Sequence, residues 1–224
     1  NDHISVHITS FVLAFARQLH SYWPKMAKGE WDPAPRGKGV TYLPESTALI
    51  VGVGEIGAET ARLLDTFGMT VLGIDARRSL LSPGLAELHP PEALDDLLPL
   101  VDFVILTVPH TPETEGMMNE ARFSMMKDTA YFVNIGRGPT VRLDALNEAL
   151  RTGQIGGAAL DVFEIEPLPA KHPLWTAPNV LITPHVAAHG PYLNERRFEV
   201  LFDNCRRFGA GEPLRNIVDK SRWF

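Results

Sequence analysis

The sequence predicts an α/β fold in which a doubly wound parallel sheet carries helices on both faces. Apolar, strand-like runs alternate with helical patterns along most of the chain, which is the order that βαβ units produce. One run, residues 48–51, breaks into Gly52, Gly54 and Gly57 and then into a helical pattern, and a second strand-like run ends at Asp75. Together these observations predict a Rossmann-type dinucleotide-binding domain.

The composition is that of an ordinary globular protein, with 45% hydrophobic and 21% charged residues among 224. A net charge of −6 leaves no basic excess to neutralise phosphates, so general nucleic-acid binding is not expected. No apolar run approaches the length of a membrane span, and the first residues do not form a signal-peptide pattern. The single cysteine, Cys205, excludes an internal disulfide and suits a reducing compartment, so we expect a cytoplasmic protein.

The first elements are a helix and an irregular segment. Residues 3–22 place apolar side chains on one stripe at helical spacing, which predicts one long amphipathic helix that Pro24 ends. Residues 25–44 contain several prolines and glycines and predict an exposed connection. This segment could be an arm that packs on a partner subunit, so we expect a homodimer.

The remaining elements follow from apolar runs and their Gly or Pro boundaries. Helices are predicted at 58–67, 92–98, 117–126, 143–151 and around 198–205, and strands at 69–74, 101–108, 131–135, 157–163 and 180–183; residues 77–91 and the tail at 216–219 are predicted as irregular.

The three glycines have separate physical roles in a dinucleotide-binding turn. Gly52 permits the tight turn off the strand, Gly54 lets the backbone approach a pyrophosphate, and Gly57 lets the helix pack close to the sheet. The helix that begins near Glu55 would present unpaired N–H groups and its positive dipole end to the phosphates.

The choice between NAD and NADP depends on the residues after the second strand. Asp75 lies 18 residues after Gly57, close to where an acid that binds ribose hydroxyls is expected. A carboxylate repels a 2′-phosphate, whereas Arg77 and Arg78 would attract one. We expect NAD, with NADP as the alternative.

Three polar side chains follow strand ends, where ligands bind in open parallel sheets. Arg137 lies between two glycines, Glu166 lies in a proline-rich loop, and His185 follows Thr183 and Pro184. An arginine fork can bind a carboxylate or polarise a carbonyl, and a histidine beside a carboxylate can exchange a proton. Together they could reduce a 2-keto acid with a nicotinamide hydride. Taken singly, Arg137 could be a solvated cation and Glu166 a surface carboxylate.

Two histidine pairs are spaced by four residues, His3 with His7 and His185 with His189. The first pair has no third ligand nearby, and Pro184 makes a regular helix across the second pair doubtful. We therefore predict no metal site.

Five segments of the sequence occur in a characteristic order, at residues 53–57, 108–114, 134–138, 160–167 and 183–188. Together they resemble the successive signatures of the D-isomer-specific 2-hydroxyacid dehydrogenases. The resemblance implies an NAD(P)-dependent oxidoreductase that transfers a hydride between NAD(H) and a small 2-keto acid or D-2-hydroxy acid.

The resemblance also implies a role for each site residue. Arg137 matches the arginine that binds the substrate carboxylate and carbonyl, His185 the acid/base, and Glu166 the carboxylate that tunes this histidine. Asp161 matches the acid that binds the nicotinamide carboxamide, although alone it could be a strand-end cap. The positions that match the dinucleotide-lining residues are Glu55, Ile56, Val108, Ile135 and Gly136, together with Asp75, Arg137 and His185.

The resemblance further implies the domain organisation. Residues 1–190 would form the dinucleotide-binding domain, including the long N-terminal hinge helix, and residues 191–224 would return to the substrate domain. Family members carry part of that domain before the first helix, so we expect a front portion outside this sequence. The small-molecule substrate stays open among glyoxylate, hydroxypyruvate, phosphoglycerate-type and larger keto acids. An NAD(H)-sensing regulatory or binding protein on the same fold is the alternative, whereas a Rossmann-type methyltransferase would not explain Arg137, Glu166 and His185.

Overall fold

The alternating pattern folds into one seven-stranded sheet within residues 2–33 and 39–220, which this computed structural model describes. All strand pairs are parallel, and the strand order is β3-β2-β1-β4-β5-β6-β7. The predicted doubly wound fold is therefore confirmed. The strands are β1 (Thr47–Val51), β2 (Thr70–Ile74), β3 (Glu87–His89), β4 (Phe103–Leu106), β5 (Tyr131–Asn134), β6 (Gly157–Leu160) and β7 (Val180–Ile182).

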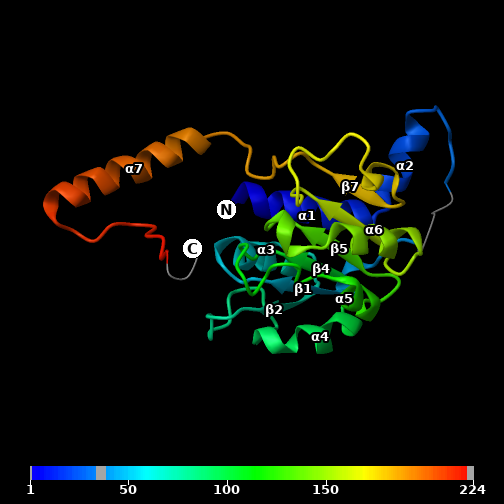
Figure 1. Ribbon diagram of the computed structural model, residues 1–224, viewed down its shortest axis with the longest axis horizontal. Helices are drawn as coiled ribbons and strands as arrows, with labels where there is room; N and C mark the ends of the chain where they lie inside the picture. Colours follow the sequence, from blue (N-terminus) through cyan, green and yellow to red (C-terminus); the bar gives the residue numbers. More distant parts are fainter. Residues whose placement is uncertain (1, 34–38, 221–224) are drawn as a thin grey trace.

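Helices cover both faces of the sheet (Figure 1). Because successive strand residues point to opposite faces, Ala48 and Ile50 of β1 pack with one helix layer while Leu49 and Val51 pack with the other. The first layer consists of α1 (Asp2–Ala16) and α3 (Glu55–Asp65), and the second of α4 (Leu94–Leu97), α5 (Glu120–Met125) and α6 (Leu143–Arg151). Short 3₁₀ turns lie at Leu43–Glu45, Pro91–Ala93, Leu98–Leu100, Gly138–Thr140 and Pro173–Thr176.

The predicted single helix over residues 3–22 is wrong. Helix α1 ends at Ala16, and a second helix, α2 (Leu19–Met26), begins after Gln18, whose φ of 58° is left-handed. The side chain of Gln18 is buried and donates to the Gly39 carbonyl at 2.8 Å and to the Tyr131 hydroxyl at 2.9 Å. These tertiary hydrogen bonds override the helical periodicity, and Pro24, expected to end the helix, lies inside α2.

Other differences concern single elements. The edge strand β3 lies in residues 77–91, which were expected to be irregular, and its three residues are too few to show an alternating pattern. In the expected arm, Lys25 is buried and pairs with Asp32 at 2.7 Å, while residues 34–38 lie outside the described residues.

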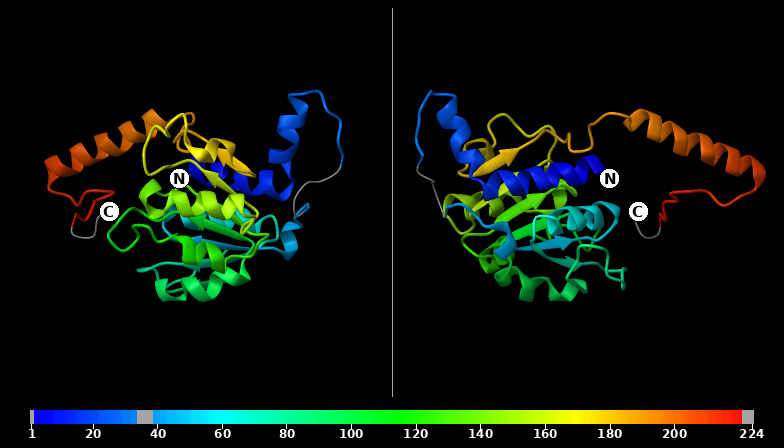
Figure 2. Two further views of the ribbon diagram at one scale, coloured as in Figure 1. Left: turned by 45° about the vertical axis from the view of Figure 1, so that its right-hand side comes forward. Right: turned by 180° about the vertical axis from the view of Figure 1, so that it is seen from behind.

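The last helix, α7 (Leu193–Ala210), has no buried residue and extends away from the sheet (Figures 1 and 2). None of the helices described is both long and apolar enough to cross a membrane.

Candidate active site

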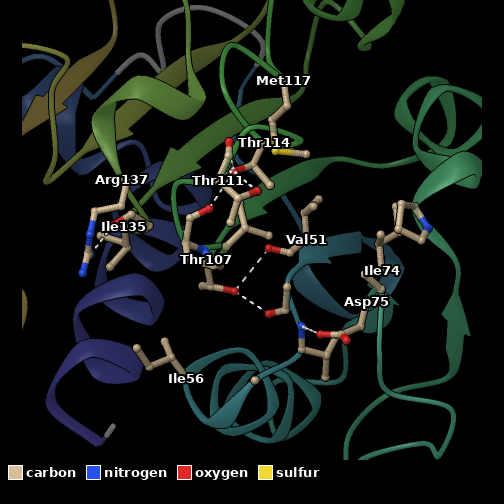
Figure 3. A pocket seen from close by; sticks show the side chains of 18 of the residues that line it. Val51, Ile56, Ile74, Asp75, Thr107, Thr111, Thr114, Met117, Ile135 and Arg137 are labelled. Carbon is tan, nitrogen blue, oxygen red and sulfur yellow. Dashed lines mark hydrogen bonds between the residues drawn. The ribbon is translucent and has the colours of Figure 1, made fainter. Parts of the chain in front are cut away.

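A cleft of about 1040 Å³ opens at the carboxyl ends of the strands (Figure 3). The cleft lies at the end of β1, between β2 on one side and β4 on the other. The strand order reverses here, because β2 and β3 extend the sheet in one direction from β1 and β4 to β7 extend it in the other. This switch point is where open parallel sheets bind ligands. The predicted residues that line the cleft are Gly52, Gly54, Ile56, Asp75, Val108, Ile135, Gly136, Arg137, Asp161 and His185.

Three predicted residues lie outside the cleft lining. Glu55 is exposed in the first turn of α3, and Gly57 is buried between that helix and the strand turn. Glu166 does not line the cleft but contacts His185, which does. The roles predicted for these three residues stay predictions.

The glycine turn is shaped by close backbone approaches. Gly52 has a φ of 99°, and a Cβ atom there would lie 2.8 Å from Cγ1 of Val108. A Cβ atom at Gly57 would lie 2.2 Å from the Gly52 carbonyl oxygen, whereas one at Gly54 meets nothing within 4 Å. Gly52 and Gly57 are therefore required by packing, and Gly54 leaves the cleft open to a ligand.

The side chain of Asp75 joins the glycine turn to the loop after β2. Its Oδ2 atom accepts from the Val53 N–H at 2.8 Å, as Figure 3 shows, and its Oδ1 atom accepts from the N–H groups of Arg77 at 2.8 Å and Arg78 at 2.9 Å. A carboxylate offers about four acceptor positions, so one position is left for a ligand hydroxyl.

His185 and Glu166 form a tight pair. Their Nδ1 and Oε2 atoms lie 2.6 Å apart, and the other carboxylate oxygen of Glu166 accepts from the Phe163 N–H at 2.9 Å. Burial raises the pKa of Glu166, but hydrogen bonds from His185 and Phe163 and the charges of His185 and Arg137 outweigh it and hold this pKa below its usual value. Glu166 is thus ionised near neutral pH, and Nε2 of His185 is the ring nitrogen left for proton exchange.

Arg137 is an exposed residue at the carboxyl end of β5, and its guanidinium donates to the Gly136 carbonyl at 2.7 Å. Figure 3 shows it beside Ile135 at the cleft. The buried Asn134 fixes this loop, because its amide donates to the Arg137 carbonyl at 3.1 Å and its carbonyl accepts from the Gly136 N–H at 3.0 Å. The arginine side chain therefore rises from a rigid backbone.

Asp161 is buried directly after β6. Its Oδ1 atom accepts from the Thr183 hydroxyl at 2.5 Å and from the Val186 N–H at 2.9 Å, and its Oδ2 atom accepts from the Ala187 N–H at 3.0 Å. These bonds fasten the loop that carries His185. The expected contact with a nicotinamide carboxamide stays a prediction.

Two polar residues that hold the site together, Thr107 and Asn134, have no role predicted from the sequence. Thr107, at the end of β4, donates to the Gly52 carbonyl at 2.5 Å (Figure 3), and Asn134 holds the Arg137 loop. The only sequence signal is a polar residue at the end of an apolar run. Across the described residues, no group of three or more His, Cys, Asp or Glu side chains is arranged to hold a metal ion.

The parallel sheet, the glycine turn and the cleft at its switch point define a dinucleotide-binding protein of the doubly wound class. The family model described as D-isomer specific 2-hydroxyacid dehydrogenase, NAD binding domain, matches residues 9–187. The chain belongs to this family, as the sequence motifs predicted.

Named relatives agree with this assignment. The chain is 36% identical to a glyoxylate reductase of Thermofilum pendens, with 98% of this chain and 65% of that protein covered. A D-isomer specific 2-hydroxyacid dehydrogenase of Xanthobacter autotrophicus Py2, solved with NADPH and MES, superposes with a TM-score of 0.88 at 35% identity and covers 100% of this chain and 89% of its own. A D-lactate dehydrogenase of Lactobacillus jensenii, solved with NAD⁺, has a TM-score of 0.83 at 25% identity over 97% and 68%. The chain therefore spans just under two thirds of the length of the Thermofilum relative.

Proposed function

We propose that the full-length protein is an NAD(P)-dependent D-2-hydroxyacid dehydrogenase that reduces a small 2-keto acid. The observation that carries the proposal is the His185–Glu166 pair, because His185 lines the same cleft as the glycine turn and Arg137. This combination places a proton donor, an anion-binding fork and a dinucleotide turn at one edge of the sheet. A protein that only senses NAD(H) would need the dinucleotide turn alone.

Each side chain has a defined task in the proposed reaction. When bound, the nicotinamide supplies the hydride that reduces the keto carbon. Arg137 would bind the substrate carboxylate and polarise the keto group through its N–H donors. His185 would give its Nε2 proton to the former carbonyl oxygen, while Glu166 holds the imidazole in position through Nδ1. The product is then a neutral hydroxyl group beside the carboxylate.

A substrate panel on the full-length protein tests this function. We expect turnover of at least one small 2-keto acid, with glyoxylate and hydroxypyruvate as the first choices because the Thermofilum relative is named a glyoxylate reductase. NADH and NADPH consumption would be followed by absorbance for each acid. If the protein binds NADH but turns over none of the acids, the proposed function is wrong and the sensing role is favoured.

We also propose that NADH is preferred over NADPH. The Asp75 carboxylate is held at the cleft by three backbone N–H groups, and the guanidinium of Arg78 is engaged with the Ser82 hydroxyl, so a 2′-phosphate would meet a carboxylate first. The Xanthobacter structure with NADPH makes the opposite preference a real alternative for this family.

The KM values of the two cofactors decide between them. We expect the wild-type protein to have a KM for NADH about tenfold or more below that for NADPH, and Asp75→Asn to shrink this ratio by about tenfold, since a lost charge repulsion of about 1.4 kcal/mol is a factor of ten. A wild-type preference for NADPH would refute the role of Asp75.

The assembly, location and domain boundary are proposals too. We propose a cytoplasmic protein that binds neither nucleic acid nor membrane, supported by the single cysteine and the net charge of −6. We also propose a homodimer, supported by the exposed Trp31 and Tyr42 on the segment after α2. A domain boundary near residue 190 is supported by α7, which begins at Leu193 and has no buried residue. We expect a dimeric mass for the full-length protein in light scattering, and a monomeric mass would contradict the role of this segment.

A further inference from the structure

A chain of hydrogen bonds links helix α1 to the loop that carries His185. Nε2 of His7 lies 3.0 Å from the Thr183 hydroxyl, which donates to Oδ1 of Asp161 at 2.5 Å. The same carboxylate accepts the N–H groups of Val186 and Ala187. These hydrogen bonds thus run from α1 through the end of β7 to the buried Asp161 at the end of β6, and from there into the loop that carries His185.

The geometry fixes which ring nitrogen of His7 carries hydrogen. The Thr183 hydroxyl has one hydrogen, and this hydrogen is directed to Asp161, whose two oxygens already accept backbone N–H groups. Thr183 can therefore only accept from His7, so Nε2 of His7 must be protonated. Burial lowers the pKa of His7, although the charge of Asp161 acts in the opposite direction, so the ring is neutral with its hydrogen on Nε2.

Helix α1 carries His7 and also contacts the helix that follows the glycine turn. The ring meets Phe11 edge-on, with centroids 4.7 Å apart, and His7 is partly buried. Two residues before His7, the Ser5 hydroxyl donates to the Ile56 carbonyl at 3.3 Å, so the same helix contacts the first turn of α3, next to the glycine turn. Helix α1 therefore connects the dinucleotide end of the cleft with the His185 end.

We propose that His7 is a positioning residue for His185, an inference that rests on the function proposed above. The N–H of His7 occupies the Thr183 oxygen and keeps the hydroxyl hydrogen directed at Asp161. Without this donor the hydroxyl is free to rotate, and Asp161 would lose one of its three donors. The backbone of His185 has a left-handed φ of 55°, so it depends on such external bonds to stay in place.

Two substitutions at one position separate the donor from its packing. His7→Leu removes the donor, whereas the amide nitrogen of His7→Gln can replace Nε2. We expect His7→Leu to lower kcat about tenfold with the KM for NADH changed less than about twofold, because one lost hydrogen bond of about 1.4 kcal/mol acts on His185 rather than on the cofactor. His7→Gln should retain most of kcat, and Ser10→Ala, which loses only a bond to the Val6 carbonyl of its own helix, should equal the wild type. Equal losses in His7→Leu and His7→Gln would overturn the proposal.

A second variant tests the path. Thr183→Val keeps the side-chain shape and removes the hydroxyl, so it should reproduce the kcat loss of His7→Leu. The double variant should then lose little more than either single variant, because both break the same chain. Losses that multiply in the double variant would overturn the proposed path.

Two further measurements do not depend on turnover and so separate a failure of this inference from a failure of the proposed function. Imidazole ¹⁵N NMR of the full-length protein should show the hydrogen on Nε2 of His7, and an Nδ1–H tautomer would overturn the inference. Amide exchange at Val186 and Ala187 should accelerate in His7→Leu but not in Ser10→Ala. Unchanged exchange in His7→Leu would show that this chain does not hold the loop.

Discussion

Replacing His185 with glutamine in the full-length protein should lower kcat for keto-acid reduction by about a hundredfold to ten-thousandfold, the range of general acid catalysis. Glutamine is similar in size and its amide nitrogen can take the place of Nε2, although it does not reproduce the contact of Nδ1 with Glu166 at 2.6 Å. Its amide cannot give up a proton at neutral pH, so the alkoxide that forms on hydride transfer would stay unprotonated. The loss should therefore appear in the chemical step.

NADH binding should survive this substitution, because the glycine turn and Asp75 lie on other strands of the sheet. Fluorescence titration should give an NADH Kd within about twofold of the wild type, a difference of less than about 0.5 kcal/mol. His189→Gln is a matched control, since His189 is exposed four residues further along and does not line the cleft. An unchanged kcat in His185→Gln would remove His185 from the role of acid and leave the cleft without its proposed proton donor.

The position of His185 was predictable because parallel strands end at one edge of a sheet. Residues that follow β5 and β7 in the sequence must then approach the same side, which is why Arg137 and His185 both line the cleft. Strands β1 and β2 were predictable because parallel strands buried on both faces consist mostly of apolar residues, and each of these two strands is a short apolar run next to a glycine. The parallel sheet, and the approach of Arg137 and His185 to one cleft, therefore follow from the pattern of apolar runs in the sequence.

The break between α1 and α2 could not be predicted in this way. It depends on Gln18, whose side chain reaches Gly39 and the hydroxyl of Tyr131, the first residue of β5. The spacing of apolar residues along a helix does not reveal a hydrogen-bond partner that is distant in the sequence. The hydrogen bonds of Asp161 could not be predicted either, because only the structure shows that the Thr183 hydroxyl and the backbone after it donate to this carboxylate. A sequence cannot distinguish an acid that binds a ligand from one that holds a loop.

The largest effect on stability is expected from Gly57→Ala. The added methyl group would lie 2.2 Å from the Gly52 carbonyl oxygen, which belongs to the backbone and cannot rotate away. The helix α3 would have to move from the sheet, and overpacking of this kind costs about 2–3 kcal/mol. Thermal unfolding should show a melting temperature about 4–12 °C lower, at the 2–4 °C per kcal/mol typical of chains of this length.

Gly54→Ala should leave stability nearly unchanged and lower the affinity for NADH. A methyl group at this position meets no protein atom within 4 Å, and the φ of −76° suits alanine, so the melting temperature should change by less than about 2 °C. The methyl group would instead occupy cleft volume beside the first N–H groups of α3, where the pyrophosphate must approach the backbone. NADH affinity should fall by about tenfold, equivalent to about 1.4 kcal/mol.

The pair of variants separates two functions that the glycine turn combines. If the turn both packs α3 against the sheet and receives the phosphates, then Gly57→Ala lowers stability at a position outside the cleft lining, and Gly54→Ala lowers affinity at a position where the added methyl group meets no protein atom within 4 Å. A stable Gly57→Ala protein would mean that α3 can shift without loss. Unchanged NADH affinity in Gly54→Ala would place the pyrophosphate elsewhere in the cleft, and the dinucleotide would then have to lie closer to Asp75 and the loop after β2 than the turn alone implies.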